Sequence, residues 1–135
     1  AVDLATDELV SASGFSPVDL GSGCQNPADV AAEGQVLYVT CGFFPYASPG
    51  AISGAGIVPV DVSSGTPVVG TALSLSANAP GPIAFCSGAG YAGDRASGAV
   101  LRYDPAANTV TATQALCPPR AGGASAYVAD LACGR

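Results

Sequence analysis

The fold is decided by three stretches that share one pattern: Ala1-Val-Asp-Leu-Ala-Thr-Asp-Glu-Leu-Val10, Val58-Pro-Val-Asp-Val-Ser-Ser-Gly-Thr-Pro-Val-Val69 and Leu101-Arg-Tyr-Asp-Pro-Ala-Ala-Asn-Thr-Val110. In each stretch a short apolar strand ends at Asp, a small polar turn follows, and a second strand comes after the turn. Self-similarity at intervals of some tens of residues is typical of repeat architectures. We therefore expect a chain of equivalent β units.

The composition indicates an all-β domain. The 135 residues are 49% hydrophobic and 10% charged, and 18 Gly and 11 Pro separate short runs that contain Val, Thr and Tyr. Such runs, interrupted by turn residues, are typical of strands joined by tight turns. No apolar run reaches the roughly eighteen residues of a membrane span, and no leader pattern stands at the start. We expect no membrane insertion and a mature or trimmed chain.

Charge and missing residue types exclude several functions. The net charge is −6, and the chain has no Lys, His, Met or Trp. An acidic surface repels phosphate backbones, so we expect no nucleic-acid partner. Without His the chain has no imidazole base and no nitrogen ligand for zinc, copper or iron, which excludes Ser-His-Asp and Cys-His catalysis within it.

The five cysteines predict two disulfides and one free thiol. Cys24 precedes one expected strand and Cys41 follows the next, while Cys117 and Cys133 flank a second such pair. The two cysteines around an antiparallel hairpin lie at the same end of it, so we predict the bridges Cys24–Cys41 and Cys117–Cys133. Cys86 is then a buried, inert thiol, with an intermolecular bridge as the alternative; five buried free thiols are the competing interpretation of the set. Bridges indicate an extracytoplasmic location: periplasm, cell surface or secretion.

The repeat divides the chain into a half unit at 1–23, whole units at 24–76 and 77–116, and a half unit at 117–135. Four short strands in about forty residues are the signature of a β-propeller blade, so we predict an all-β fold of about three blades of four antiparallel strands. A β-sandwich is the rival fold, but it does not explain the repeated cysteine placement. The expected strands are Asn26–Ala32, Gln35–Thr40, Ile57–Val62, Pro67–Leu75, Pro82–Cys86, Gly90–Gly93, Ala99–Tyr103 and Thr109–Leu116, with two more in 1–12 and two in Ala124–Gly134.

The first whole unit carries a family resemblance. Its core Leu37-Tyr-Val-Thr40 is preceded by Asn26-Pro-Ala-Asp-Val-Ala31 and followed by Val58-Pro-Val-Asp-Val-Ser-Ser-Gly-Thr-Pro-Val-Val-Gly-Thr71. This order resembles the YVTN repeat, an NHL-like β-propeller repeat of bacterial and archaeal surface proteins, with its Tyr-Val-Thr-Asn core and later IDxxT-like turn. Cys41 stands where that repeat has Asn, and the next unit departs further with Gly90-Tyr-Ala-Gly93. The resemblance implies a propeller of the cell surface and says nothing about chemistry.

Three blades are too few for a closed ring, because propellers usually contain about four to eight. We expect two chains to join head to tail into a six-bladed ring, a homodimer in which each seam blade takes strands from both chains. The rival interpretation is that the chain is one part of a longer propeller.

Candidate binding residues lie in the loops that connect the second and third strands of each whole unit. Phe43, Phe44 and Tyr46 lie on a long Pro- and Gly-containing insertion, where aromatic side chains can stack on a sugar or an apolar ligand, or bury against a partner. Plugging the end of the ring is the competing interpretation. Asp94 and Arg95 lie in the corresponding loop of the next unit, as a substrate contact or as a surface ion pair of little energetic worth.

Three acidic residues, Asp3, Asp61 and Asp104, invite a metal interpretation. Each stands just before a turn, where a short acidic side chain accepts hydrogen bonds from the turn's backbone. The chain has no run of closely spaced acidic residues typical of a calcium loop. We therefore expect a structural role for the three, no metal and no cofactor.

These observations predict a non-catalytic extracytoplasmic module that binds or scaffolds at the cell envelope. The alternative is a propeller enzyme, a lactonase-like hydrolase or a lyase, with calcium held by carboxylates in the central channel. Only two Glu in the whole chain make such a site hard to build. A purely structural repeat within a larger surface protein is the third interpretation, and the ligand is not specified by the sequence.

Overall fold

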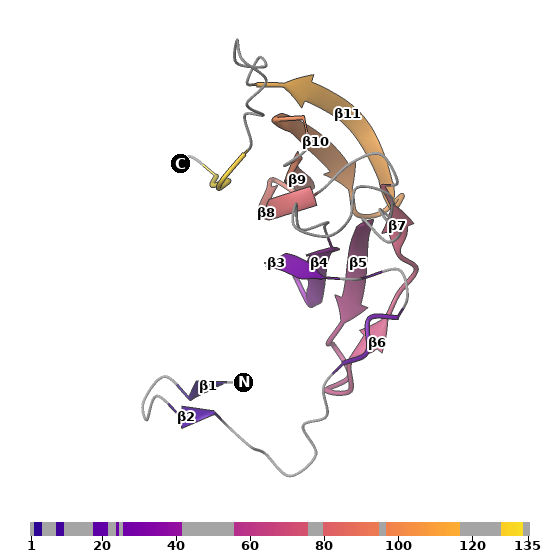
Figure 1. Cartoon of the computed structure of the whole chain (residues 1–135). Coiled ribbons are helices and arrows are strands. Elements are labelled where there is room, and N and C mark those ends of the chain that lie inside the picture. The colour runs from indigo at the N-terminus through magenta and orange to yellow at the C-terminus, as the bar shows by residue number, and fades with distance from the viewer. Residues whose placement is uncertain are drawn as a thin grey trace.

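Every regular element that the structure describes is a β-strand (Figure 1). The all-β prediction is therefore confirmed, and no helix in the described residues is long or apolar enough for a transmembrane segment. The computed structural model describes residues 2–3, 8–9, 18–21, 24, 26–41, 56–75, 80–94, 97–116 and 128–133.

The first sheet is an antiparallel meander in chain order, with one interruption in its outer strand. That interruption falls beside Pro59, which has no N–H to donate; Gly70 donates its N–H to the Pro59 carbonyl at 2.8 Å, between the two short outer segments. The predicted positions of the first three strands are correct to within one residue. The strands are β3 (Pro27–Glu33), β4 (Val36–Cys41), β5 (Gly56–Asp61) and β6 (Val68–Val69), with β7 (Leu73–Ser74) also paired to β5.

The second sheet repeats this order without interruption. Its first two strands are joined by Ser87 and Gly88, both at positive φ, as a two-residue type I′ hairpin turn requires. The four strands overlap the predicted ones and differ from them by at most two residues at either end. They are β8 (Pro80–Cys86), β9 (Ala89–Asp94), β10 (Ala99–Asp104) and β11 (Thr109–Ala115).

The two sheets pack face to face, with β3 next to β8 and the outer strands β6 and β11 at the far sides (Figure 1). The ring of Tyr38 from β4 lies 4.6 Å from the Phe85 ring and 5.7 Å from the Tyr103 ring, centroid to centroid. Gly90 leaves room for these aromatics, since a Cβ there would lie 3.0 Å from both the Phe85 and the Tyr103 rings. The buried side chains between the sheets are Tyr38, Ile57, Leu75, Ile83, Ala92, Leu101 and Tyr103.

Two hydrogen bonds join the first two strands of the first sheet, β3 and β4, to β8 of the second sheet. The buried Thr40 hydroxyl donates to the Gly81 carbonyl, and the Ile83 N–H donates to the Asp29 carboxylate at 3.0 Å. These bonds fix the relative position of the sheets, because a buried polar group left without a partner costs free energy.

Neither end of the chain forms a four-stranded sheet within the described residues. β1 (Val2–Asp3) and β2 (Glu8–Leu9) form an antiparallel hairpin, as predicted for residues 1–12, and within the described residues they pair only with each other. Strands were also predicted in Ala124–Gly134, but residues 128–133 form none. Among the described residues, no strand pairs with 128–133 to complete a ladder, and an isolated strand is not stable in water.

Candidate functional site

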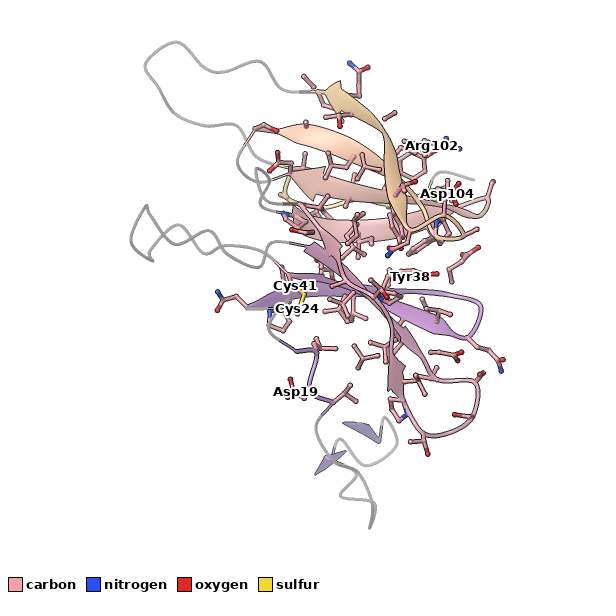
Figure 2. The ribbon with its side chains drawn as sticks, turned by 90° about the vertical axis from the view of Figure 1, so that its right-hand side faces the viewer. Asp19, Cys24, Tyr38, Cys41, Arg102 and Asp104 are labelled. Atoms are coloured by element: carbon pink, nitrogen blue, oxygen red, sulfur yellow. A yellow bond between two sulfur atoms is a disulfide. The ribbon has the colours of Figure 1, made fainter. Side chains whose placement is uncertain are left out.

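The bridge Cys24–Cys41 forms as predicted, with a Cα–Cα distance of 5.0 Å. Cys41 ends β4 opposite Pro27, at the start of β3, so Cys24 reaches it across the same end of the hairpin. Cys41 is fully buried among Val58, Val60 and other apolar residues, on the face of the first sheet that points away from the second. Figure 2 shows this bridge at one end of the strands.

The second bridge corrects the prediction. Cys86 pairs with Cys133, so the predicted Cys117–Cys133 bridge and the free Cys86 thiol are both wrong. The prediction placed Cys133 at the end of a hairpin, but residues 128–133 form no strand, and Cys133 lies at the end of β8 instead. The Leu116 N–H donates to the Gly98 carbonyl at 3.4 Å, at the end of the second sheet opposite Cys86. Cys117 itself lies outside the described residues.

The predicted binding loops leave the two sheets at the same end, which we call the loop end. β4 ends here at Cys41 and β9 ends here at Asp94. Thr40 contacts Gly81, and neighbouring Pro80 pairs with Asp94, so these ends lie side by side. The loops that carry the predicted residues therefore start close together, although Phe43, Phe44, Tyr46 and Arg95 lie outside the described residues.

Asp94 is buried at the loop end, with 1% of its surface exposed. Its carboxylate accepts a hydrogen bond from the Ser97 hydroxyl, and its carbonyl accepts one from the Gly98 N–H at 2.9 Å. The Ser97 hydroxyl oxygen in turn accepts the Ala99 N–H at 3.3 Å. These hydrogen bonds link the end of β9 to the residues at and just before the start of β10.

The opposite end of the sheets carries the acidic turn residues, as the position of Asp104 in Figure 2 shows. Asp61 accepts the Ser63 N–H at 2.8 Å, and Asp104 accepts the N–H groups of Ala106 and Ala107 at 2.9 and 3.2 Å. The Ser63 hydroxyl and N–H hold the pKa of Asp61 below its ordinary value. The predicted turn role is confirmed for Asp61 and Asp104; the Asp3 side chain lies outside what the structure describes.

A polar chain that the sequence analysis missed links the sheets at this end. Tyr103 donates its hydroxyl to the Asn108 amide oxygen at 2.7 Å, and the Asn108 amide nitrogen donates to the Thr71 carbonyl at 3.0 Å. Burial of Tyr103, with smaller effects from Tyr38 and Asp104, raises its pKa to about 12. Asn108 adopts a positive φ of 50°, which Asn tolerates better than most residues. An Asn at a turn is the local sequence feature that could have indicated this position.

Within the described ranges, no three His, Cys, Asp or Glu side chains gather as metal ligands would. In the described residues, the candidate site consists of the ends of β4 and β9, where the predicted loops begin, and the Cys24–Cys41 bridge lies beside the first of these loops. Among known proteins, no family model, no curated protein and no solved structure matches the chain.

Proposed function

We propose that the chain is a non-catalytic β-propeller module of the extracytoplasmic space that binds or scaffolds through its loop end. The observation that carries the proposal is the relation between the sheets. Each is an antiparallel meander in chain order, their apolar faces pack together, and their first strands β3 and β8 are neighbours. Consecutive propeller blades are four-stranded sheets arranged around a central channel in this manner.

The two disulfides support the compartment. Disulfides persist in oxidising environments and are rare where glutathione and thioredoxin keep thiols reduced. One bridge fixes the start of the first loop and the other fixes residues 128–133 to β8. The oxidised chain is thus the form in which the module works.

The loop end is the proposed binding surface. Cys41 immediately precedes the insertion with Phe43, Phe44 and Tyr46, and the buried Asp94 immediately precedes Arg95. Rigid elements that position variable loops are the usual support of binding residues. Aromatic side chains in such a loop suit a sugar or an apolar partner surface.

Assembly completes the proposal. The β1–β2 hairpin carries the same Asp-and-turn pattern as the outer halves of the two sheets, but it is only half a blade. We propose that two chains share seam blades in a six-bladed homodimer ring. A shared blade would bury the free strand edges that otherwise invite aggregation.

Light scattering coupled to size-exclusion chromatography, followed by negative-stain electron microscopy, tests the assembly. The expected result for the oxidised chain is twice the mass of one chain and a ring of six blades. A stable particle with the mass of one chain would refute the homodimer. A ring with another number of blades would refute the six-bladed closure.

A further inference from the structure

Residues Val128–Cys133, which we call the strap, lie against the second sheet on the face away from the first (the yellow segment of Figure 1). Val128 is 8% exposed and packs on the bare backbone of Gly93. A Cβ at Gly93 would lie 2.7 Å from the Val128 Cβ and 3.1 Å from the ring of Pro82. Pro82 and Gly93 therefore form a small apolar seat that Val128 fills.

The seat in the second sheet is equivalent in position to the residues of the first sheet that contact β8. In the first sheet, Asp29 and Thr40 are paired in register and contact β8 at Gly81 and Ile83. In the second sheet, the pairing of Ile83 with Ala92 places the adjacent Pro82 beside Gly93. Each sheet thus uses the same pair of positions, on its first and second strands, to receive the next segment of chain.

The direction of the strap agrees with this correspondence. Val128 lies near Pro82, at the start of β8, and Cys133 is bonded to Cys86, at its end. The strap therefore runs alongside β8 in the same direction. It occupies the place of the first strand of a third sheet.

The attachment of the strap differs from that of β8. β8 is hydrogen-bonded to β9 as part of a four-stranded sheet, and it contacts the first sheet through buried side chains and two hydrogen bonds. Residues 128–133 belong to no strand ladder, and Cys133 is exposed. Exchange at a disulfide requires access of a thiolate to sulfur. The Cys86–Cys133 bridge meets that condition at the exposed Cys133, whereas the other bridge is less accessible, with Cys41 fully buried and Cys24 half-buried.

We propose that the strap is exchangeable: a small thiol opens the Cys86–Cys133 bridge, and the seat of Pro82 and Gly93 then accepts the strap of a second copy of the chain. The occupant is a second copy because its Val128 and Cys133 match the seat and Cys86 by identity, and exchange of identical elements is a low-cost route to dimers. The inference goes beyond the propeller assembly and does not depend on ring closure.

The chemistry balances without an added oxidant. A small thiolate attacks the Cys133 sulfur, which forms a mixed disulfide and releases Cys86 as a thiolate. The Cys86 thiolate of a second copy then attacks the mixed disulfide at the Cys133 sulfur, forms the intermolecular bridge and releases the small thiolate. The small thiol is regenerated and acts as a catalyst.

Mixed-isotope exchange tests the proposal. Equal amounts of unlabelled and ¹⁵N-labelled chain, both carrying Cys117→Ser to remove the remaining thiol, are incubated with reduced glutathione and blocked with iodoacetamide. Mass spectrometry should detect Cys86–Cys133 peptides with one labelled half. Cys86 and Cys133 should be modified at least about tenfold faster than Cys24 and Cys41, because thiol exchange depends on access. Equal rates at the two bridges, or an absence of mixed peptides when Cys133 is modified, would overturn the proposal.

A variant of the seat provides the second measurement. Gly93→Ala places a methyl group where Val128 lies, so it should loosen the strap and speed the modification of Cys133 severalfold. The control is Val68→Ala, at an exposed position in the first sheet, with no expected change. An unchanged rate in Gly93→Ala would also overturn the proposal. Light scattering on the oxidised chain, without thiol, reports ring closure separately, so either proposal can fail while the other stands.

Discussion

Removal of one oxygen atom, in Tyr103→Phe, tests whether the polar chain between the sheets stabilises them. The Tyr103 ring is fully buried, and its hydroxyl donates to the Asn108 amide oxygen at 2.7 Å. Phe fills the same space, so the packing against Tyr38 is retained and only the hydrogen bond is lost. A hydrogen bond contributes about 1 kcal/mol net, and the acceptor left behind on the partly buried Asn108 adds a desolvation cost. We expect the free energy of unfolding to fall by about 1–2 kcal/mol.

Urea unfolding of the oxidised chain, followed by far-UV circular dichroism, measures this loss. The midpoint should fall by about 0.5–1 M at a urea slope of about 2 kcal/mol per molar, the middle of the range for small domains. Asn108→Gly removes the same bond and the bond to Thr71, while Gly accepts the positive φ at this position. Because the two residues share an interaction, the double variant should cost about 1 kcal/mol less than the sum of the single variants. Strictly additive costs would refute a coupled Tyr103–Asn108 pair.

The pKa of Tyr103 provides an independent measurement of the same burial. Its folded value of about 12 lies above the ordinary value of 10. Between these values the unfolded chain loses the proton and the folded chain keeps it, so stability should fall as the pH rises from about 10 toward 12. Burial also raises the pKa of Tyr38, so the diagnostic signal is a phenolate component that titrates near pH 12 and is lost in Tyr103→Phe. Titration of all tyrosines near pH 10 in the folded chain would contradict the burial.

Three further predictions concern the frame. Leu101→Ala, at a side chain 1% exposed between the sheets, should lower the free energy of unfolding by about 2–5 kcal/mol, whereas the 58% exposed Leu116→Ala should change it by less than about 0.5, both measured by urea unfolding. The paired substitutions Cys24→Ser and Cys41→Ser should cost about 3 kcal/mol, because the bridge closes a loop of 17 residues; an unchanged thermal midpoint would contradict this. Asp61→Ala should reduce the loss of stability as the pH falls below about 4. The folded pKa of Asp61 is lowered, so its stabilising contribution is present above the unfolded pKa and is lost as the pH falls. Urea midpoints across acidic pH measure this effect, and identical acid profiles for the two chains would argue against it.

The sequence predicted what depends on neighbours along the chain. Strand positions followed from short apolar runs and turn residues, and the Asp61 and Asp104 turns formed where the pattern indicated. The Cys24–Cys41 bridge was also predictable, because both cysteines belong to one hairpin whose register fixes them.

What the sequence did not reveal depends on the packing of one sheet on another. Cys86 joins Cys133 only because the strap lies along β8, and no spacing in the chain encodes that position. The contact of Asn108 with Thr71 likewise joins segments far apart in the sequence. The burial of Asp94 also depends on packing around the end of β9, which its neighbours in the sequence do not indicate. Short polar side chains in Gly-rich loops are more often solvated, so composition pointed to the surface.

The two inter-sheet seats explain why one contact is permanent and the other can exchange. In the first sheet the seat is polar: the Thr40 hydroxyl donates to the Gly81 carbonyl, and the Asp29 carboxylate, which also accepts the Val30 N–H, accepts the Ile83 N–H. Separation of the sheets would break both hydrogen bonds to β8. In the second sheet the same two positions are Gly93 and Pro82, which carry no side-chain hydrogen-bonding group and receive Val128. Loss of Val128 from this seat exposes apolar surface but breaks no side-chain hydrogen bond there. The free-energy cost of releasing the strap is therefore smaller than that of separating the two sheets. The exposed Cys86–Cys133 bridge is then the main restraint on the strap. The change from Asp29 and Thr40 to Pro82 and Gly93 therefore converts a fixed sheet contact into a releasable one.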